Sequence, residues 1–195
     1  MSKQVDTRSK IEASASAILR EQGVEALTVR NIAARAGLST MGVYSHFGGK
    51  DQVCEALFVA GFAELGERVE QAKSENDPRD AVLRSAAIYF DFFLANRHRY
   101  ALMFGMNSSV APPSERARDA AKASFKHWAL VISLLSGAME VGPEEVRLAR
   151  QIWASTHGCI AIGEHSPIGT IDDVRQLALD SVAYLVDGYL AKNAK

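Results

Sequence analysis

The chain of 195 residues is long enough for one domain of ordinary size, or for a small module joined to a larger one. Apolar residues make up 48% and charged residues 23%, which is ordinary globular usage and argues against disorder, collagen-like repeats and a coiled-coil rod. The net charge is -1, and basic and acidic residues are nearly equal in number both in the first 55 residues and in the rest of the chain. Charge alone therefore neither supports nor excludes a nucleic-acid partner.

Nearly every segment follows a helical period and no run alternates like a strand, so the sequence predicts an all-α fold of about nine helices. The first helix is expected to end at Gly23. Thr28 is the expected N-cap of a short second helix that ends at Gly37. Ser39 is expected to cap a third short helix, which stops at the pair Gly48-Gly49.

The rest of the chain is predicted to form longer helices. A connector helix that begins near Lys50 carries a continuous apolar seam, and the helix opened by Asp77-Pro78 is so rich in aromatic residues that it must be buried. The last helix keeps an i, i+3, i+4, i+7 apolar pattern for four turns. The expected helical ranges are about 50–72, 77–95, 97–105, 114–138, 143–163 and 171–191, with a loop over 106–113.

The composition also limits where in the cell the protein is expected and which cofactors it could bind. No run approaches 18 consecutive apolar residues, and the start lacks the apolar core of a signal peptide, so we expect a cytoplasmic protein with no membrane partner. Cys54 and Cys159 have no C-x-x-C spacing, which argues against a disulfide framework or a zinc site. No metal and no cofactor are expected.

Residues 28–47 have the spacing of a helix-turn-helix. Two short helices joined by the turn Gly37-Leu38-Ser39 match this motif, whose second helix enters the major groove of DNA. On the second helix Val43 and Phe47 are expected to point inward, which leaves small or hydrogen-bonding side chains outside. The alternative is an αα corner of a helical bundle.

The recognisable part of the motif is the run LTVRNIAARAGLS over residues 27–39, followed by GVYSHF over 42–47 and GGKD over 48–51. It closely resembles the DNA-binding domain of the tetracycline-repressor (TetR) family. The resemblance implies a helix-turn-helix domain over residues 1–50 and an effector-binding and dimerisation domain over 51–195. A shorter stretch, WASTHG over 153–158, is similar to the W-x-x-x-H-G signature of one TetR effector-domain subgroup, and RYALMF over 99–104 is similar to that subgroup's preceding element.

The resemblance implies that Tyr44 and His46 reach DNA phosphates, which set register rather than sequence. Lysine is unfavourable at a helix N-terminus, so a bound phosphate best explains Lys50. Base reading then falls to Thr40, Met41 and Ser45. The alternatives are that Tyr44 packs at the rim and that His46 only caps its helix. The full predicted set of DNA contacts is Thr28, Arg30, Ser39, Thr40, Met41, Gly42, Tyr44, Ser45, His46 and Lys50.

The chain departs from the family pattern at Met41 and Gly42, where Gly followed by Thr or Ser is common. The operator sequence of relatives therefore cannot be transferred to this chain.

Aromatic residues gather in the middle helices and are predicted to enclose a mainly apolar effector cavity. The alternative is a solid core, with His157 a structural, hydrogen-bonded histidine rather than a polar anchor for the effector. The full predicted set of effector contacts is Tyr89, Phe93, Tyr100, Met103, Phe104, Phe125, Trp128, Trp153 and His157.

No nucleophile–base pair, glycine-rich phosphate loop or H-E-x-x-H motif occurs, so no enzyme is expected. The predicted protein is a TetR-family repressor, released from a palindromic double-stranded DNA operator by a small apolar or aromatic effector. The homodimer is expected to form through the last two helices, where Ala154, Gly158 and Ala161 allow close approach. The alternatives are a helical carrier or enzyme that does not bind DNA, and a constitutive regulator with no effector.

Overall fold

The computed structural model describes residues 2–105, 114–137, 140–165 and 169–194. Within these ranges the regular structure is helical and no strand occurs, so the predicted all-α class is confirmed. The described residues contain nine α-helices: α1 (Ser2–Gln22), α2 (Val29–Ala36), α3 (Thr40–Phe47), α4 (Lys50–Glu70), α5 (Pro78–Ala95), α6 (Arg97–Met103), α7 (Glu115–Ile132), α8 (Pro143–His165) and α9 (Ile171–Asn193). Three short 3-10 helices join them: η1 (Val24–Ala26), η2 (Gln71–Ser74) and η3 (Ser133–Leu135).

The expected helix over 114–138 ends earlier than its apolar period suggested. α7 stops at Ile132 and tightens into the 3-10 turn η3. Ser133 Oγ donates to the carbonyl of Leu130 at 2.9 Å, and Ser136 Oγ donates to the carbonyl of Ser133 at 3.1 Å. Serine side chains compete in this way with the backbone for helical acceptors. The expected loop over 106–113 lies outside the described residues.

Two compact units divide the chain. The first unit comprises Met1–Ala63 and Asn96–Ala121, and the second comprises Glu64–Ala95 and Lys122–Lys195. Two of the boundaries between the units lie inside helices, one in α4 and one in α7. Each of these helices continues without a break across the boundary. Among the described residues, no helix is both long and apolar enough to cross a bilayer.

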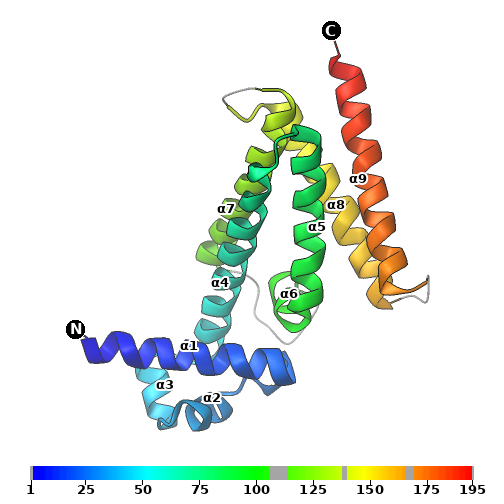
Figure 1. Cartoon of the computed structure of the whole chain (residues 1–195). Coiled ribbons are helices and arrows are strands. Elements are labelled where there is room, and N and C mark those ends of the chain that lie inside the picture. Colours follow the sequence, from blue (N-terminus) through cyan, green and yellow to red (C-terminus); the bar gives the residue numbers. More distant parts are fainter. Residues whose placement is uncertain (1, 106–113, 138–139, 166–168, 195) are drawn as a thin grey trace. The chain divides into compact units, whose positions relative to one another are not determined.

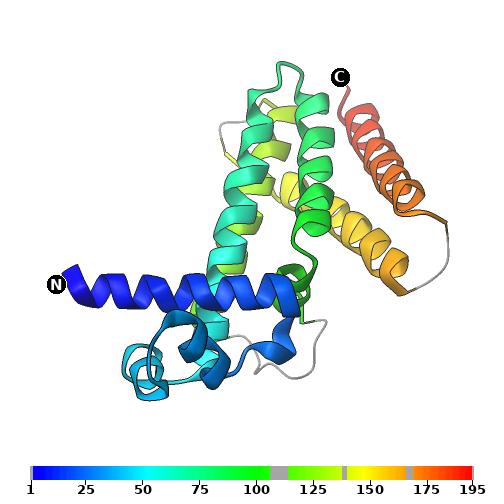
Figure 2. The same ribbon diagram turned by 60° about the horizontal axis from the view of Figure 1, so that its bottom comes forward.

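In the first unit α2 and α3 pack on one side of α1, as Figures 1 and 2 show. The apolar face of α1, formed by Ile11, Ala15, Ile18 and Leu19, is buried. α6 also packs on α1, where Arg99 Nη2 donates to Ser16 Oγ at 3.1 Å. The core of this unit includes Ile11, Ala15, Ile18, Leu19, Leu27, Ile32, Val43, Phe47, Val53, Leu57 and Leu102.

In the second unit α9 runs beside α5 and α8 (Figure 1). The aromatic helix α5 is buried on most of its circumference, as predicted, with Phe90 and Phe92 fully enclosed. Gly163 lets α9 approach α8, because a Cβ at this position would lie 2.9 Å from Val174 Cγ1.

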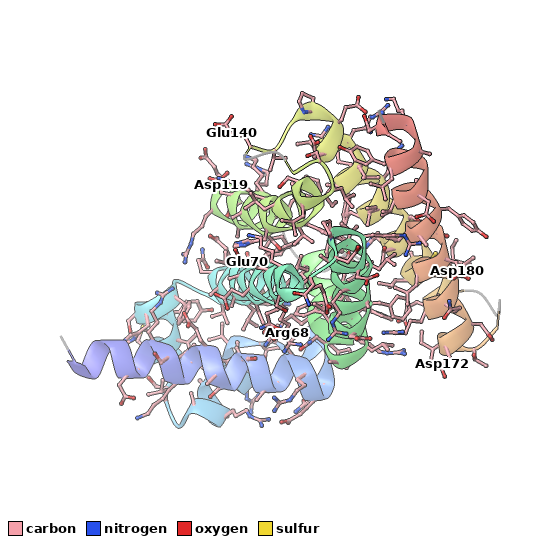
Figure 3. All side chains as sticks on the ribbon, turned by 45° about the horizontal axis from the view of Figure 1, so that its top comes forward. Arg68, Glu70, Asp119, Glu140, Asp172 and Asp180 are labelled. Carbon is pink, nitrogen blue, oxygen red and sulfur yellow. The ribbon has the colours of Figure 1, made fainter. Side chains whose placement is uncertain are left out.

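Two ion pairs and one histidine–carboxylate contact connect the helices of the second unit. Arg79 Nε donates to Asp187 at 2.7 Å, and Arg175 Nε donates to Asp91 at 3.1 Å, so two pairs join α5 to α9. Figure 3 labels Glu70 near the end of α4, where its Oε2 lies 2.9 Å from His127 Nδ1 of α7.

Candidate DNA-binding surface and effector-domain site

The helix-turn-helix begins at the cap that the sequence predicts. Thr28 has extended backbone angles, and its Oγ1 accepts a hydrogen bond from the Asn31 N–H at 3.1 Å. α2 ends at Gly37, whose φ of 67° is left-handed and whose N–H donates to the carbonyls of Ala33 and Ala34. Glycine adopts this conformation without a Cβ penalty, so it closes the helix and turns the chain towards α3.

α3 is capped and oriented by its own sequence. Ser39 Oγ accepts from the Gly42 N–H at 3.1 Å, which confirms the predicted N-cap. Val43 is 0% exposed and Phe47 is 6% exposed, so the predicted inward face is also confirmed. Because these side chains fix the rotation of α3, the exposed face consists of Thr40, Met41, Tyr44 and Ser45.

The outward face of α3 presents an unusual apolar residue. Met41 is 72% exposed and Tyr44 is 51% exposed, while Thr40 and Ser45 are also on the surface. The Tyr44 ring lies against Gly49, since a Cβ added there would meet Tyr44 Cε1 at 3.6 Å. Burial normally stabilises methionine and tyrosine side chains, so exposing both on one short helix suits a binding surface.

Ser45 and His46 are both turned back towards the Gly42 carbonyl. Ser45 Oγ donates to Gly42 O at 3.0 Å, and His46 Nδ1 lies 2.9 Å from the same oxygen. A carbonyl can only accept, so His46 Nδ1 carries a proton in this contact, and Nε2 can donate to a phosphate oxygen only when the imidazole is doubly protonated. Ser45 Oγ also lies 3.1 Å from His46 Nδ1, so that nitrogen can share its proton with one hydroxyl lone pair. The second lone pair can accept from the amino groups of adenine or cytosine in the major groove.

The other predicted DNA contacts lie beside α3 in the chain. Thr28 and Arg30 are exposed at the start of α2, and Lys50 is half-buried as the first residue of α4. Gly42 is half-buried, and a Cβ there would meet only ordinary contacts, with Leu38 Cβ at 3.6 Å and Ser39 Oγ at 3.7 Å. The protein's own packing therefore does not require glycine at this position.

The second unit contains a polar network centred on Tyr89 of α5. Trp153 Nε1 donates to Tyr89 Oη at 3.1 Å, and the same oxygen lies 3.2 Å from His157 Nδ1. The rings of Tyr89 and Trp128 stack with centroids 5.0 Å apart, and those of Trp153 and His157 are 5.6 Å apart. Four of the predicted effector contacts, from α5, α7 and α8, therefore lie together.

His157 bonds to Tyr89 within this network. Tyr89 Oη accepts the Trp153 N–H and lies 3.2 Å from His157 Nδ1. It donates to Nδ1 when the imidazole carries its proton on Nε2, and it accepts a second hydrogen bond when Nδ1 carries the proton. Burial lowers the pKa of His157, which favours the neutral imidazole.

The remaining predicted effector contacts are distributed between the two units. Phe93 belongs to the second unit, is 2% exposed and meets Phe90 edge to face at 5.8 Å. Phe125 is half-buried on α7. Tyr100, Met103 and Phe104 belong to the first unit, where the Tyr100 and Phe104 rings are 4.5 Å apart. One cavity bounded by all nine side chains stays a prediction.

Sequence reasoning missed Ser85. It is 0% exposed on α5, and its Oγ accepts from Trp128 Nε1 at 2.7 Å while donating to the Val82 carbonyl at 2.7 Å. The available signal was the one serine of α5, which stands one turn before Tyr89 on the helix predicted to be buried. A buried hydroxyl requires a partner.

A capped helix-turn-helix with an exposed second helix, followed by a larger helical unit, defines a DNA-binding regulator. Comparison with known proteins identifies the family. Residues 11–57 match the model of bacterial regulatory proteins of the tetR family, and residues 82–185, more than half of the chain, match the tetracyclin repressor-like C-terminal domain. The chain belongs to the TetR family of transcriptional regulators.

Curated relatives agree. The HTH-type transcriptional regulators Rv1816 of Mycobacterium tuberculosis (strain H37Rv) and Mb1846 of Mycobacterium bovis are each 27% identical over 124 residues. The match covers 59% of this chain and 53% of each relative, so the chain spans about half the length of the curated relatives it matches.

Solved structures extend the likeness to most of the fold. A protein of unknown function from Rhodococcus sp. RHA1 has a TM-score of 0.74 at 27% identity, covering 91% of this chain and 94% of that one. The TetR-family regulator PfmR of Thermus thermophilus has a TM-score of 0.62 at 20% identity, covering 89% and 97%. A structure described as a SmeT–triclosan complex has a TM-score of 0.60 at 19% identity, covering 94% and 91%. The last two similarities concern the fold alone.

Proposed function

We propose that the protein is a homodimeric, cytoplasmic repressor without catalytic activity, which binds a palindromic operator and releases it when a small apolar or aromatic effector binds. The exposed face of α3 is the observation that carries this proposal. Its rotation is fixed by Val43 and Phe47, and it presents Met41 and Tyr44 to solvent. A rigid helix with a prepared outer face suits insertion into the major groove.

The proposed DNA contacts fall into two kinds. Thr40, Met41 and Ser45 are proposed to read base edges, and Met41 has the apolar surface that a thymine methyl group requires. Tyr44, His46 and Lys50 are proposed to hold phosphates, together with the capped N-terminus of α2 at Thr28. The subgroup suggested by the W-x-x-x-H-G pattern stays a prediction.

The proposed dimer forms through the outer faces of α8 and α9. Leu177 is 52% exposed and Tyr184 is 79% exposed. The two residues are seven positions apart, so they lie on the same face of α9. Ile162 of α8 is 48% exposed. Cβ atoms added at Gly158 or Gly188 would meet nothing within 4 Å, so these backbone positions are open to close approach by a second copy.

The proposed effector site is the polar network of the second unit. Tyr89, Trp128, Trp153 and His157 combine broad aromatic surfaces with a few oriented polar atoms, which is the usual composition of small-molecule sites. The fold neighbour SmeT, described in complex with triclosan, gives further support. A carrier or enzyme that does not bind DNA, and a constitutive regulator, are the competing proposals.

Selection of DNA fragments from a random pool by the full-length protein tests the proposed function. We expect a two-fold symmetric consensus whose half-sites are about one helical turn, roughly 34 to 36 Å, apart or a multiple of it. Binding should weaken steeply with salt, because phosphate contacts release counterions. No salt-dependent retention of any fragment would instead favour a carrier or an enzyme.

Lys50→Ala and Tyr44→Phe are expected to weaken binding to all DNA sequences alike, because both residues are proposed phosphate contacts. Lys50→Ala should also flatten the slope of log affinity against log salt by about one unit, since one fewer counterion is released. Fluorescence anisotropy over a salt series measures both quantities. Lys192→Ala on α9 is the control, and an unchanged slope for Lys50→Ala would remove Lys50 from the interface.

Met41→Gly is expected to change which operator is preferred more than it changes non-specific affinity. The residue is 72% exposed at the start of α3, where it can reach a base edge, and it differs from the residue common in the family. Selection from the same random pool with both proteins gives the comparison, with Met41→Leu as an apolar control. Identical consensus sequences for the native chain and Met41→Gly would contradict base reading by Met41.

A further inference from the structure

An arginine of α1 holds the C-terminal end of the proposed recognition helix. Arg8 Nη1 donates to the carbonyl of His46 at 3.0 Å, across 38 residues of sequence. Its guanidinium carbon lies 4.1 Å from the centroid of the Phe47 ring. On its other side Arg8 Nε pairs with Glu12 Oε1 at 3.3 Å, one turn along the same helix.

These contacts meet a physical need at the end of α3. The last four carbonyls of a helix lack partners within the helix, and the carbonyl of His46 is one of them. A cation is favourable at this end because the helix dipole is negative there. Phe47 is 6% exposed and belongs to the core of the first unit, so an arginine stacked on its ring is held against a fixed surface.

The contacts of Arg8 fix residues that are proposed to meet DNA. The His46 backbone is held by Arg8 through its carbonyl, and the His46 ring is held by Gly42 through Nδ1. Tyr44 and Ser45 occupy the same last turn of α3. Binding groups require a supporting shell that keeps them within about 0.5 Å of the productive geometry.

We propose that Arg8 is a positioning residue for DNA recognition, which orders the last turn of α3 without contacting DNA itself. Its pairing with Glu12 supports this role over direct phosphate binding, because the carboxylate already offsets the arginine charge. The inference rests on the proposed DNA contacts of α3.

Arg8→Met tests the inference, because it keeps much of the apolar stem and removes the guanidinium. We expect affinity for the selected operator to fall by about tenfold at 25 °C, the equivalent of one lost charge-assisted hydrogen bond. The salt slope should stay unchanged. Hydrogen exchange at the Gly48 amide, which donates to the Tyr44 carbonyl at 2.7 Å, should become faster.

The control is Arg20→Met, which removes an exposed arginine of the same helix that pairs with Glu21 at 3.9 Å. It should leave affinity and exchange at Gly48 unchanged. A slope reduced by about one unit in Arg8→Met would overturn the proposal in favour of a direct phosphate contact. A lower melting temperature with native affinity and native Gly48 exchange would overturn it in favour of a purely structural role. Failure of the native chain to bind any DNA would overturn the proposed function and, with it, this inference.

Discussion

The double variant Leu177→Glu/Tyr184→Glu is expected to be a monomer of about 21.1 kDa that has lost specific operator binding. Affinity for the operator should fall by about 10³-fold or more, towards the non-specific level, because a monomer engages only one half-site. Sedimentation at micromolar concentration measures the mass, and fluorescence anisotropy on the selected operator measures the affinity.

The expected size of this effect follows from two-fold symmetry. Leu177 and Tyr184 lie on one exposed face of α9, beside the open backbone at Gly188. In an isologous interface a patch meets the same patch of its partner, so each new carboxylate faces others of like charge. Removing four apolar side chains and adding four charges per dimer should therefore separate the subunits.

Gln176→Glu is the matched control, since it adds a carboxylate to an exposed position of α9 about 100° around the helix from Leu177. It should leave both the mass and the operator affinity unchanged. If the native chain itself sediments as a particle of 21.1 kDa at micromolar concentration, the proposed dimer is wrong.

The helix-turn-helix was predictable because its determinants are local. Thr28 and Ser39 cap helices through amides only three residues away, and Gly37 supplies a left-handed angle that few other residues adopt. The inward positions Val43 and Phe47 follow from helical spacing. These interactions can be inferred from residue type and spacing alone.

Features that depend on distant partners could not be predicted. Arg8 meets α3 across 38 residues, and Ser85 meets Trp128 across 43. Helical periodicity likewise does not reveal the division into two units, because two of its three boundaries lie inside the continuous helices α4 and α7. For the Tyr89 network, the sequence predicted only a cluster of aromatic residues. Residue spacing does not show which polar atoms of those side chains form hydrogen bonds with one another.

Phe93→Ala is expected to lower the free energy of unfolding by about 3–5 kcal/mol, the usual cost of truncating a buried phenylalanine. The ring is 2% exposed and packs edge to face on Phe90, so little of its surface is available to a ligand in this structure. Denaturant unfolding measures the loss. Leu94→Ala is the control at a half-buried neighbouring position and should cost less.

A thermal-shift screen of small aromatic compounds on the native chain distinguishes an effector site from a solid core. A site around Tyr89 and Trp153 predicts that some small aromatic compound raises the melting temperature of the native chain, because a ligand that binds only the folded state stabilises it by mass action. Tyr89→Phe, which removes the acceptor of the Trp153 N–H, should reduce that shift. If no compound shifts the melting temperature of the native protein, a solid core is favoured. A constitutive regulator would then be the better interpretation. A ligand releases a repressor from its operator only by binding the DNA-free conformation more tightly than the DNA-bound one, and a solid core offers no site for such a ligand.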